Sequence, residues 1–161
     1  MRILFAAIVV AVLPAAAAAQ TADTAADKEA VLATVNKFLD TMAAKDAAGA
    51  RTALLPEGRL FIVREDKGQP VVRSMTHEAY LERLATRKET LRERIWNPEV
   101  RIHGGLATVW APYDFWIDGK FSHCGVDAFD LVKTAEGWRI AGGAYTVEPR
   151  GCPPSPLGPL K

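Results

Sequence analysis

The fold of this chain is decided by residues 107–147, which read ATVWAPYDFWIDGKFSHCGVDAFDLVKTAEGWRIAGGAYTV. β-Branched and aromatic residues recur along this stretch, and both kinds favour strands. Asp118-Gly119 is a two-residue hairpin turn, and residues 134–137 (TAEG) form a looser turn. The stretch therefore predicts three long antiparallel strands, over residues 107–117, 121–133 and 138–147.

Shorter strands are expected upstream of this meander. Residues 59–64 (RLFIVR) and 71–75 (VVRSM) are rich in β-forming residues, and the EDKG between them predicts a hairpin. Residues 92–96 and 100–103 are two further candidates. Gly104-Gly105 is then a hairpin turn that leads into the first long strand.

Three helices are predicted among these strands. From Asp27 onwards, apolar residues recur at the spacing of one helix face: Val31, Val35, Phe38, Leu39 and Met42. Asp46 is a candidate N-cap for a short second helix that ends before Pro56, and Thr76 for a third. This order of elements predicts an α+β domain, with about three helices on one side of a curved antiparallel sheet.

Residues 1–19 have the three parts of a secretion signal. Arg2 gives a positive start, residues 3–13 form an uncharged apolar run, and Ala17-Ala18-Ala19 supplies the small residues of a cleavage site. The run is shorter than the about 20 residues of a membrane span. We therefore predict cleavage before Gln20, a flexible mature N-terminus over residues 20–26, and a secreted or periplasmic protein that is not bound to a membrane.

The charge balance argues against a nucleic-acid binder. Lys and Arg together number 20, and Asp and Glu number 19. Removal of Arg2 with the signal makes the two totals equal, whereas nucleic-acid-binding domains carry a basic excess. We expect no nucleic-acid partner.

The chain has two cysteines, Cys124 and Cys152. In an exported protein an even count predicts one disulfide, and two free thiols are the alternative. Without CxxC spacing the pair does not predict a metal site. The bond would pin the Pro- and Gly-rich tail over residues 149–161, whose prolines cannot continue a strand ladder.

A resemblance to a known fold family is carried by four segments, ATVW (107–110), DGK (118–120), HCGVDAFDL (123–131) and GWRI (137–140). With the order of elements, they resemble the NTF2-like superfamily, which includes SnoaL-like cyclases, ketosteroid isomerases and scytalone dehydratase. The chain looks like the exported DUF4440 or lumazine-binding-like members. The resemblance implies one domain over residues 27–148, a cone with a cavity in its mouth. It leaves function open, because this fold hosts unrelated activities.

A candidate pocket follows from the Asp118-Gly119 turn. With that turn, His123 opposes Asp114, and Asp127 opposes Trp110, and opposed residues share a sheet face. Apolar walls with a few polar groups are typical of a small-ligand site. We predict a ligand-binding pocket lined by Trp110, Tyr113, Asp114, Trp116, His123, Asp127 and Tyr145.

Pro112 leaves open which sheet face lines this pocket. Proline cannot donate to the ladder, so a bulge is expected there, and a bulge would move the residues on one side of it to the other face.

Two pocket residues are candidates for proton transfer. His123 beside Asp114 would be a base whose tautomer the carboxylate sets. Burial would raise the pKa of Asp127 and make it an acid. The alternative is that both residues are structural. The charged residues from Glu82 to Arg94, together with His77 and His103, are expected to face solvent.

Three functions follow. The first is an exported, homodimeric domain that binds a small, partly apolar ligand in the cone. The second is a lyase or isomerase in which Asp127 or His123 moves a proton next to a carbonyl. The third is a protein-interaction module that uses an apolar sheet face. No cofactor is expected, and the sequence lacks the GxSxG, HExxH, Walker A and GxGxxG motifs. Convergence of Asp127, His123 and Asp114 in one cavity would favour the enzyme.

Overall fold

The computed structural model describes residues 16–160, so residues 1–15 of the predicted secretion signal lie outside the described residues. The helices are α1 (Ala16–Ala44), α2 (Ala47–Ala53) and α3 (His77–Thr86). The strands are β1 (Leu54–Asp66), β2 (Gln69–Thr76), β3 (Leu91–Ile95), β4 (Glu99–His103), β5 (Leu106–Ile117), β6 (Lys120–Thr134) and β7 (Gly137–Val147). The predicted α+β fold is confirmed.

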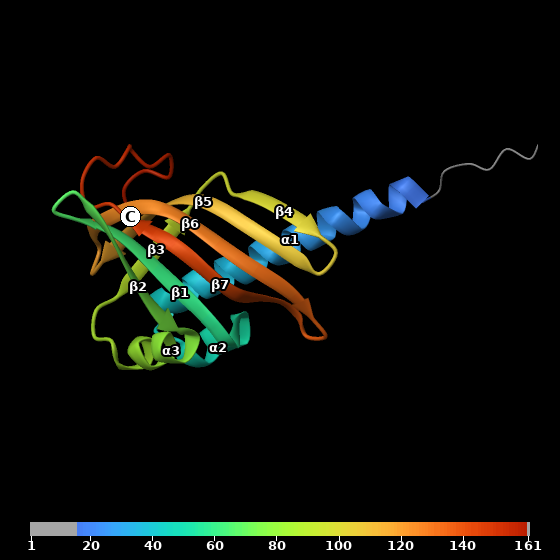
Figure 1. The fold of residues 1–161 in the computed structure, drawn as a ribbon, viewed down its shortest axis with the longest axis horizontal. Helices are drawn as coiled ribbons and strands as arrows, with labels where there is room; N and C mark the ends of the chain where they lie inside the picture. Colours follow the sequence, from blue (N-terminus) through green and yellow to red (C-terminus); the bar gives the residue numbers. More distant parts are fainter. Residues whose placement is uncertain (1–15, 161) are drawn as a thin grey trace, which may run out of the picture.

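One sheet holds all seven strands, in the order β2-β1-β7-β6-β5-β3, with β4 also pairing with β5. The sheet curves around α1, and α2 and α3 lie together at one edge (Figure 1). Every pair is antiparallel except β1 with β7, which is parallel. The expectation of a wholly antiparallel sheet is wrong at this pair. A parallel pair needs a long crossover, and the chain between β1 and β7 supplies one.

Helix α1 begins at Ala16, well before the predicted start at Asp27. Residues 20–26, which were expected to be a flexible segment, lie within the helix. Alanine has the highest helix propensity, and this segment is alanine-rich. The N-terminal part of α1 extends past the end of the sheet (Figure 1).

The predicted apolar face of α1 and the two predicted helix caps are confirmed. All five residues of that face are buried: Val31, Val35, Phe38, Leu39 and Met42. The Asp46 side chain accepts a hydrogen bond from Gly49 N at 2.8 Å, and the Thr76 hydroxyl accepts one from Ala79 N at 3.1 Å. None of the described helices is long and apolar enough to cross a membrane.

The register of β5 with β6 differs from the prediction because of a β-bulge. Trp116 pairs with Phe121, but Phe115 pairs with His123, so Ser122 is the extra residue. Beyond this point Asp114 lies opposite Cys124, and Trp110 lies opposite Ala128. The predicted pairs of Asp114 with His123 and of Trp110 with Asp127 are therefore wrong. The expected bulge exists, but at Ser122 rather than at Pro112.

The tail is fixed to the sheet at two places. A disulfide joins Cys124 on β6 to Cys152, with 5.8 Å between the Cα atoms, and this confirms the predicted bond. Directly after β7, Glu148 forms an isolated antiparallel bridge with Cys124, and this bridge holds the start of the tail beside β6. Further along, the Gly158 carbonyl accepts a hydrogen bond from Arg94 Nη2 at 2.7 Å.

Candidate functional site

A cavity of about 530 Å³ opens between the sheet and the helices α1 and α3. Its apolar wall includes Phe38 and Met42 of α1, Leu60 of β1, Phe115 of β5 and Phe129 of β6. The ring of Phe38 packs edge-on against that of Phe129, with 6.1 Å between the centroids. Aromatic and aliphatic walls of this kind are typical of small-molecule sites.

Two carboxyl groups meet inside the cavity. Asp127 of β6 is only 3% exposed, and Glu93 of β3 is partly accessible from the cavity. The two carboxyl groups are close enough for each to shift the pKa of the other. Asp127 Oδ2 is buried and has no hydrogen-bond partner among the described residues.

Burial dominates the electrostatics of this pair, because desolvation penalises the charged form. It raises the pKa of Asp127 from an ordinary 3.8 to about 7. Burial, followed by the charge of Asp127, raises the pKa of Glu93 well above its ordinary range. Two neighbouring carboxyl groups in an apolar environment cannot both ionise cheaply, so at neutral pH at least one proton stays on the pair.

Two tyrosines line the same cavity. The Tyr80 hydroxyl is buried without a hydrogen-bond partner among the described residues, and burial together with the charge of Glu93 raises its pKa. Burial and the charge of Glu93 also raise the pKa of Tyr145 to about 12, whereas Arg64 and Arg83 oppose the rise. Both tyrosines therefore keep their hydroxyl protons at neutral pH and can donate a hydrogen bond.

His123 reaches the cavity because of the bulge at Ser122, which turns the imidazole onto the face that carries Phe115. The imidazole stacks on the Phe115 ring with 4.7 Å between the centroids, and its Nδ1 lies 3.0 Å from Ser122 Oγ. Burial and the charge of Arg64 lower the pKa of His123. At neutral pH the imidazole is therefore uncharged.

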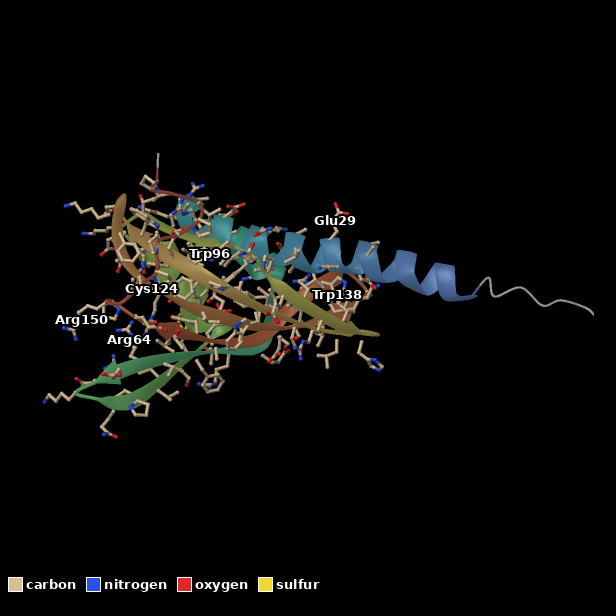
Figure 2. The ribbon with its side chains drawn as sticks, turned by 90° about the horizontal axis from the view of Figure 1, so that it is seen from above. Glu29, Arg64, Trp96, Cys124, Trp138 and Arg150 are labelled. Carbon is tan, nitrogen blue, oxygen red and sulfur yellow. A yellow bond between two sulfur atoms is a disulfide. The ribbon has the colours of Figure 1, made fainter. Side chains whose placement is uncertain are left out.

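The open end of the cavity, called the mouth below, is lined by Arg64 of β1 and by Arg83 and Arg87 at the end of α3. All three side chains are exposed. None makes a salt bridge with a described carboxylate, although Glu65 also lines the cavity. Figure 2 shows Arg64 at the end of the molecule opposite to the N-terminus of α1.

The structure brings only some of the predicted pocket residues together. His123, Asp127 and Tyr145 line the cavity, whereas Trp110, Tyr113, Asp114 and Trp116 are not among its lining residues. Trp110 is 55% exposed. Tyr113 is buried beside His123 and donates its hydroxyl hydrogen bond to Thr146 O at 2.6 Å.

Asp114 has a separate environment. Its carboxylate accepts hydrogen bonds from Arg94 Nη2 at 2.6 Å, from Arg94 Nε at 2.9 Å and from Trp116 Nε1 at 2.9 Å. Burial alone would raise its pKa, but the hydrogen bonds from Arg94 and Trp116 hold the pKa below its usual value. The expected convergence of Asp114 with His123 and Asp127 is therefore not observed, because the bulge places Asp114 opposite Cys124.

The sequence did not lead us to include Glu93 in the candidate site, and the expectation that His77 faces solvent is wrong. Glu93 was grouped with the charged residues expected to face solvent, although it alternates with Leu91 and Ile95, and period-2 alternation in a strand puts these three on one face. His77, also expected to face solvent, is fully buried with Nδ1 2.6 Å from Leu55 O, and burial lowers its pKa. Within residues 16–160, no three or more His, Cys, Asp and Glu side chains come together in a group that could hold a metal ion.

Solved structures with the same architecture share little sequence with this chain. A protein of unknown function from Mycobacterium tuberculosis is 16% identical, with a TM-score of 0.66, and the match covers 80% of this chain and 75% of that one. An NTF2-like protein with a cystatin-like fold from Novosphingobium aromaticivorans is 13% identical, with a TM-score of 0.65 and coverages of 81% and 87%. A cystatin-like protein of unknown function from Nostoc punctiforme is 14% identical, with a TM-score of 0.63 and coverages of 83% and 96%. These likenesses define the fold as NTF2-like.

The family is defined by sequence. Residues 26–146 match the model of the family described as "Putative lumazine-binding", and the chain belongs to this family. A search of curated proteins found no match.

Proposed function

We propose that this protein binds a small, partly apolar ligand in its cavity. The observation that carries the proposal is a pair of buried polar atoms without partners, Asp127 Oδ2 and the Tyr80 hydroxyl, in the wall of a cavity of about 530 Å³. An unsatisfied buried polar group costs about 1–3 kcal/mol. A ligand that supplies both partners would recover this free energy.

The two atoms differ in the hydrogen bonds they can make. An ionised Asp127 Oδ2 accepts a hydrogen bond, and the Tyr80 hydroxyl can donate one. A complementary ligand therefore carries a donor and an acceptor beside an aromatic body, which Phe38, Phe115 and Phe129 would contact. Lumazine, the molecule in the family description, is a planar heterocycle with N–H and C=O groups along one edge. It is therefore the first ligand to test.

Calorimetric titration of the purified protein with lumazine tests the proposal. Saturable one-site binding is expected, and Asp127→Asn and Tyr80→Phe should each weaken it by about tenfold, the value of one well-placed hydrogen bond. Asp130→Asn is the matched control, because Asp130 is an exposed carboxylate on the same strand that does not line the cavity. Absence of saturable binding would refute lumazine as the ligand, and equal affinities in all variants would refute Asp127 and Tyr80 as its contacts.

Proton transfer next to a carbonyl is a second candidate function, favoured by the pKa of about 7 for Asp127. A general base works best with a pKa near the working pH, and the neutral His123 faces the same cavity. The measurement is deuterium exchange at the carbon next to the carbonyl of a bound ketone, followed by NMR. Exchange that Asp127→Asn leaves unchanged would exclude Asp127 as the base.

We also infer that the protein is exported and acts as a homodimer. Export is supported by the signal pattern of residues 1–19, and the Cys124–Cys152 disulfide is compatible with an extracytoplasmic location.

The candidate dimer surface is the outer sheet face, where Trp110 and Leu106 are more than half exposed. The same surface would serve the third candidate, a protein-interaction module, and sedimentation of the wild type and Trp110→Ser tests self-association there.

A further inference from the structure

Three cationic side chains gather at the mouth without acidic partners. Arg83 and Arg87 lie at the C-terminal end of α3, where cations complement the helix dipole. The dipole does not account for Arg64, which comes from β1 and lines the same mouth. Glu65 lines the cavity with them, and Glu89 lies with Arg83, Arg87 and Lys88 along an adjacent surface groove. Neither glutamate makes a salt bridge with the three arginines, and the cations outnumber the carboxylates, so the mouth carries an excess of positive charge.

The charges of these guanidinium groups affect the pKa values of residues inside the cavity. The charge of Arg64 acts to lower the pKa of both His123 and Tyr145. The charge of Arg83 acts to lower the pKa of Tyr145, and the charge of Arg87 that of Tyr80. Other exposed arginines without salt bridges, such as Arg73, do not line the cavity. The mouth is therefore a cluster that faces the cavity as well as the solvent.

The interior of the cavity disfavours an anion, in contrast to the mouth. The cavity wall already holds two carboxyl groups, the buried Asp127 and the partly buried Glu93, and a ligand anion placed beside them would add a further negative charge to an apolar environment, at high cost. A ligand with one charged end could enter in only one orientation, with its anionic group at the arginines and its neutral end at the carboxyl pair.

We propose that the natural ligand is an amphipathic anion, and this proposal rests on the proposed function. The apolar body of the ligand fills the cavity. Its carboxylate, sulfonate or phosphate group contacts Arg64, Arg83 and Arg87 at the mouth. Guanidinium groups bind such anions through charge-assisted, often bidentate hydrogen bonds. The anion thereby supplies the acidic partners that these arginines lack within residues 16–160.

The test uses two fluorescent probes with the same aromatic skeleton, N-phenyl-1-naphthylamine, which is neutral, and 8-anilinonaphthalene-1-sulfonate, which carries one sulfonate. Both are titrated into the wild type, into the triple variant Arg64→Gln/Arg83→Gln/Arg87→Gln, and into the matched control Arg73→Gln/Arg92→Gln/Arg101→Gln. The control removes the same charge from exposed arginines that do not line the cavity. Near-ultraviolet circular dichroism checks that each variant keeps its fold.

We expect the sulfonate to bind more tightly than the neutral probe to the wild type, and each probe to displace the other. The mouth variant should weaken sulfonate binding by at least about tenfold and neutral-probe binding by less than about twofold, and the control should change neither. Added salt should weaken only the sulfonate.

Different failures have different meanings. If the neutral probe binds but the mouth variant leaves sulfonate affinity unchanged, the anion proposal is overturned and the ligand-binding cavity stands. The same holds if the control variant weakens the sulfonate as strongly, or if the probes do not compete. If neither probe binds the folded wild type, the cavity is not a ligand site and both proposals fall.

Discussion

Glu93 of β3 and Asp127 of β6 line the same cavity although β5 lies between their strands in the sheet. Burial and the mutual influence of the two carboxyl groups keep a proton on the pair, in an apolar cavity whose wall includes two tyrosines and a histidine. Because the folded state holds a proton that the unfolded chain releases, the pair makes both stability and ligand binding depend on pH.

The free energy of unfolding should fall as the pH rises from about 6.5 to 8.5. In the unfolded chain both groups ionise near their ordinary values, 3.8 for Asp127 and 4.5 for Glu93, but in the folded state both pKa values are raised, that of Asp127 to about 7. The folded state then binds more protons than the unfolded state, so stability decreases with pH. We expect a loss of about 1–2 kcal/mol across this window, measured by urea denaturation.

The double variant Glu93→Gln/Asp127→Asn is the control for this pH dependence, because it removes both titrating groups and preserves their shapes. The histidines act in the opposite sense. Burial lowers the pKa of His77 and of His123, so their contribution increases with pH up to about their ordinary value of 6.5 and is constant above it. A double variant that keeps the wild-type decline would show that the pair is not its source.

Asp114→Asn should destabilise the fold without changing ligand binding. Arg94 and Asp114 form a largely buried ion pair, with side-chain exposures of 14% and 3%, and removal of one partner leaves the other charge uncompensated. We expect a loss of about 2–4 kcal/mol in urea denaturation, with probe affinity within about twofold of the wild type. Exposed Asp130→Asn should cost less than about 0.5 kcal/mol. Weakened binding at unchanged stability would place Asp114 in the ligand site.

The Cys124–Cys152 disulfide should leave no titratable thiol in denatured, unreduced protein. Its removal in Cys124→Ala/Cys152→Ala should lower the free energy of unfolding by about 3–4 kcal/mol, because the bond closes a loop with a sequence separation of 28 residues. Release of the tail should also make the bond after Arg150 more sensitive to trypsin than in the oxidised wild type. Two free thiols in the wild type would contradict the bond.

Export should yield a mature protein that begins at or near Gln20. Mass spectrometry of the protein secreted by a bacterial host measures this end directly, and an Ala17→Leu/Ala19→Leu variant should impair cleavage because signal peptidases need small residues there. Met1 in the exported fraction would refute a cleaved signal.

The elements of the fold could be predicted because their signals are local. The turn at Asp118-Gly119, the caps Asp46 and Thr76 and the apolar stripe of α1 each depend on a few neighbouring residues. The disulfide could be predicted because two cysteines allow only one pairing. The early start of α1 was not predicted, because the alanine-rich segment before Asp27 was interpreted as a flexible, low-complexity stretch. The parallel pairing of β1 with β7 was not predicted, because it depends on a distant part of the chain.

The sequence by itself determined the α+β architecture, the strand meander and three residues of the candidate site, His123, Asp127 and Tyr145. Only the tertiary structure decided which side chains meet in the cavity. A single extra residue, Ser122, reverses the faces of β5 relative to β6, because successive side chains in a strand point to opposite sides. The register of β3 with β5 places Arg94 opposite Asp114 and Glu93 opposite Phe115. The register of β5 with β6 places Asp127 opposite Ala111, on the face that carries Phe115 and Glu93. Where a bulge forms depends on the packing of the whole sheet, and no local pattern of residues specifies it.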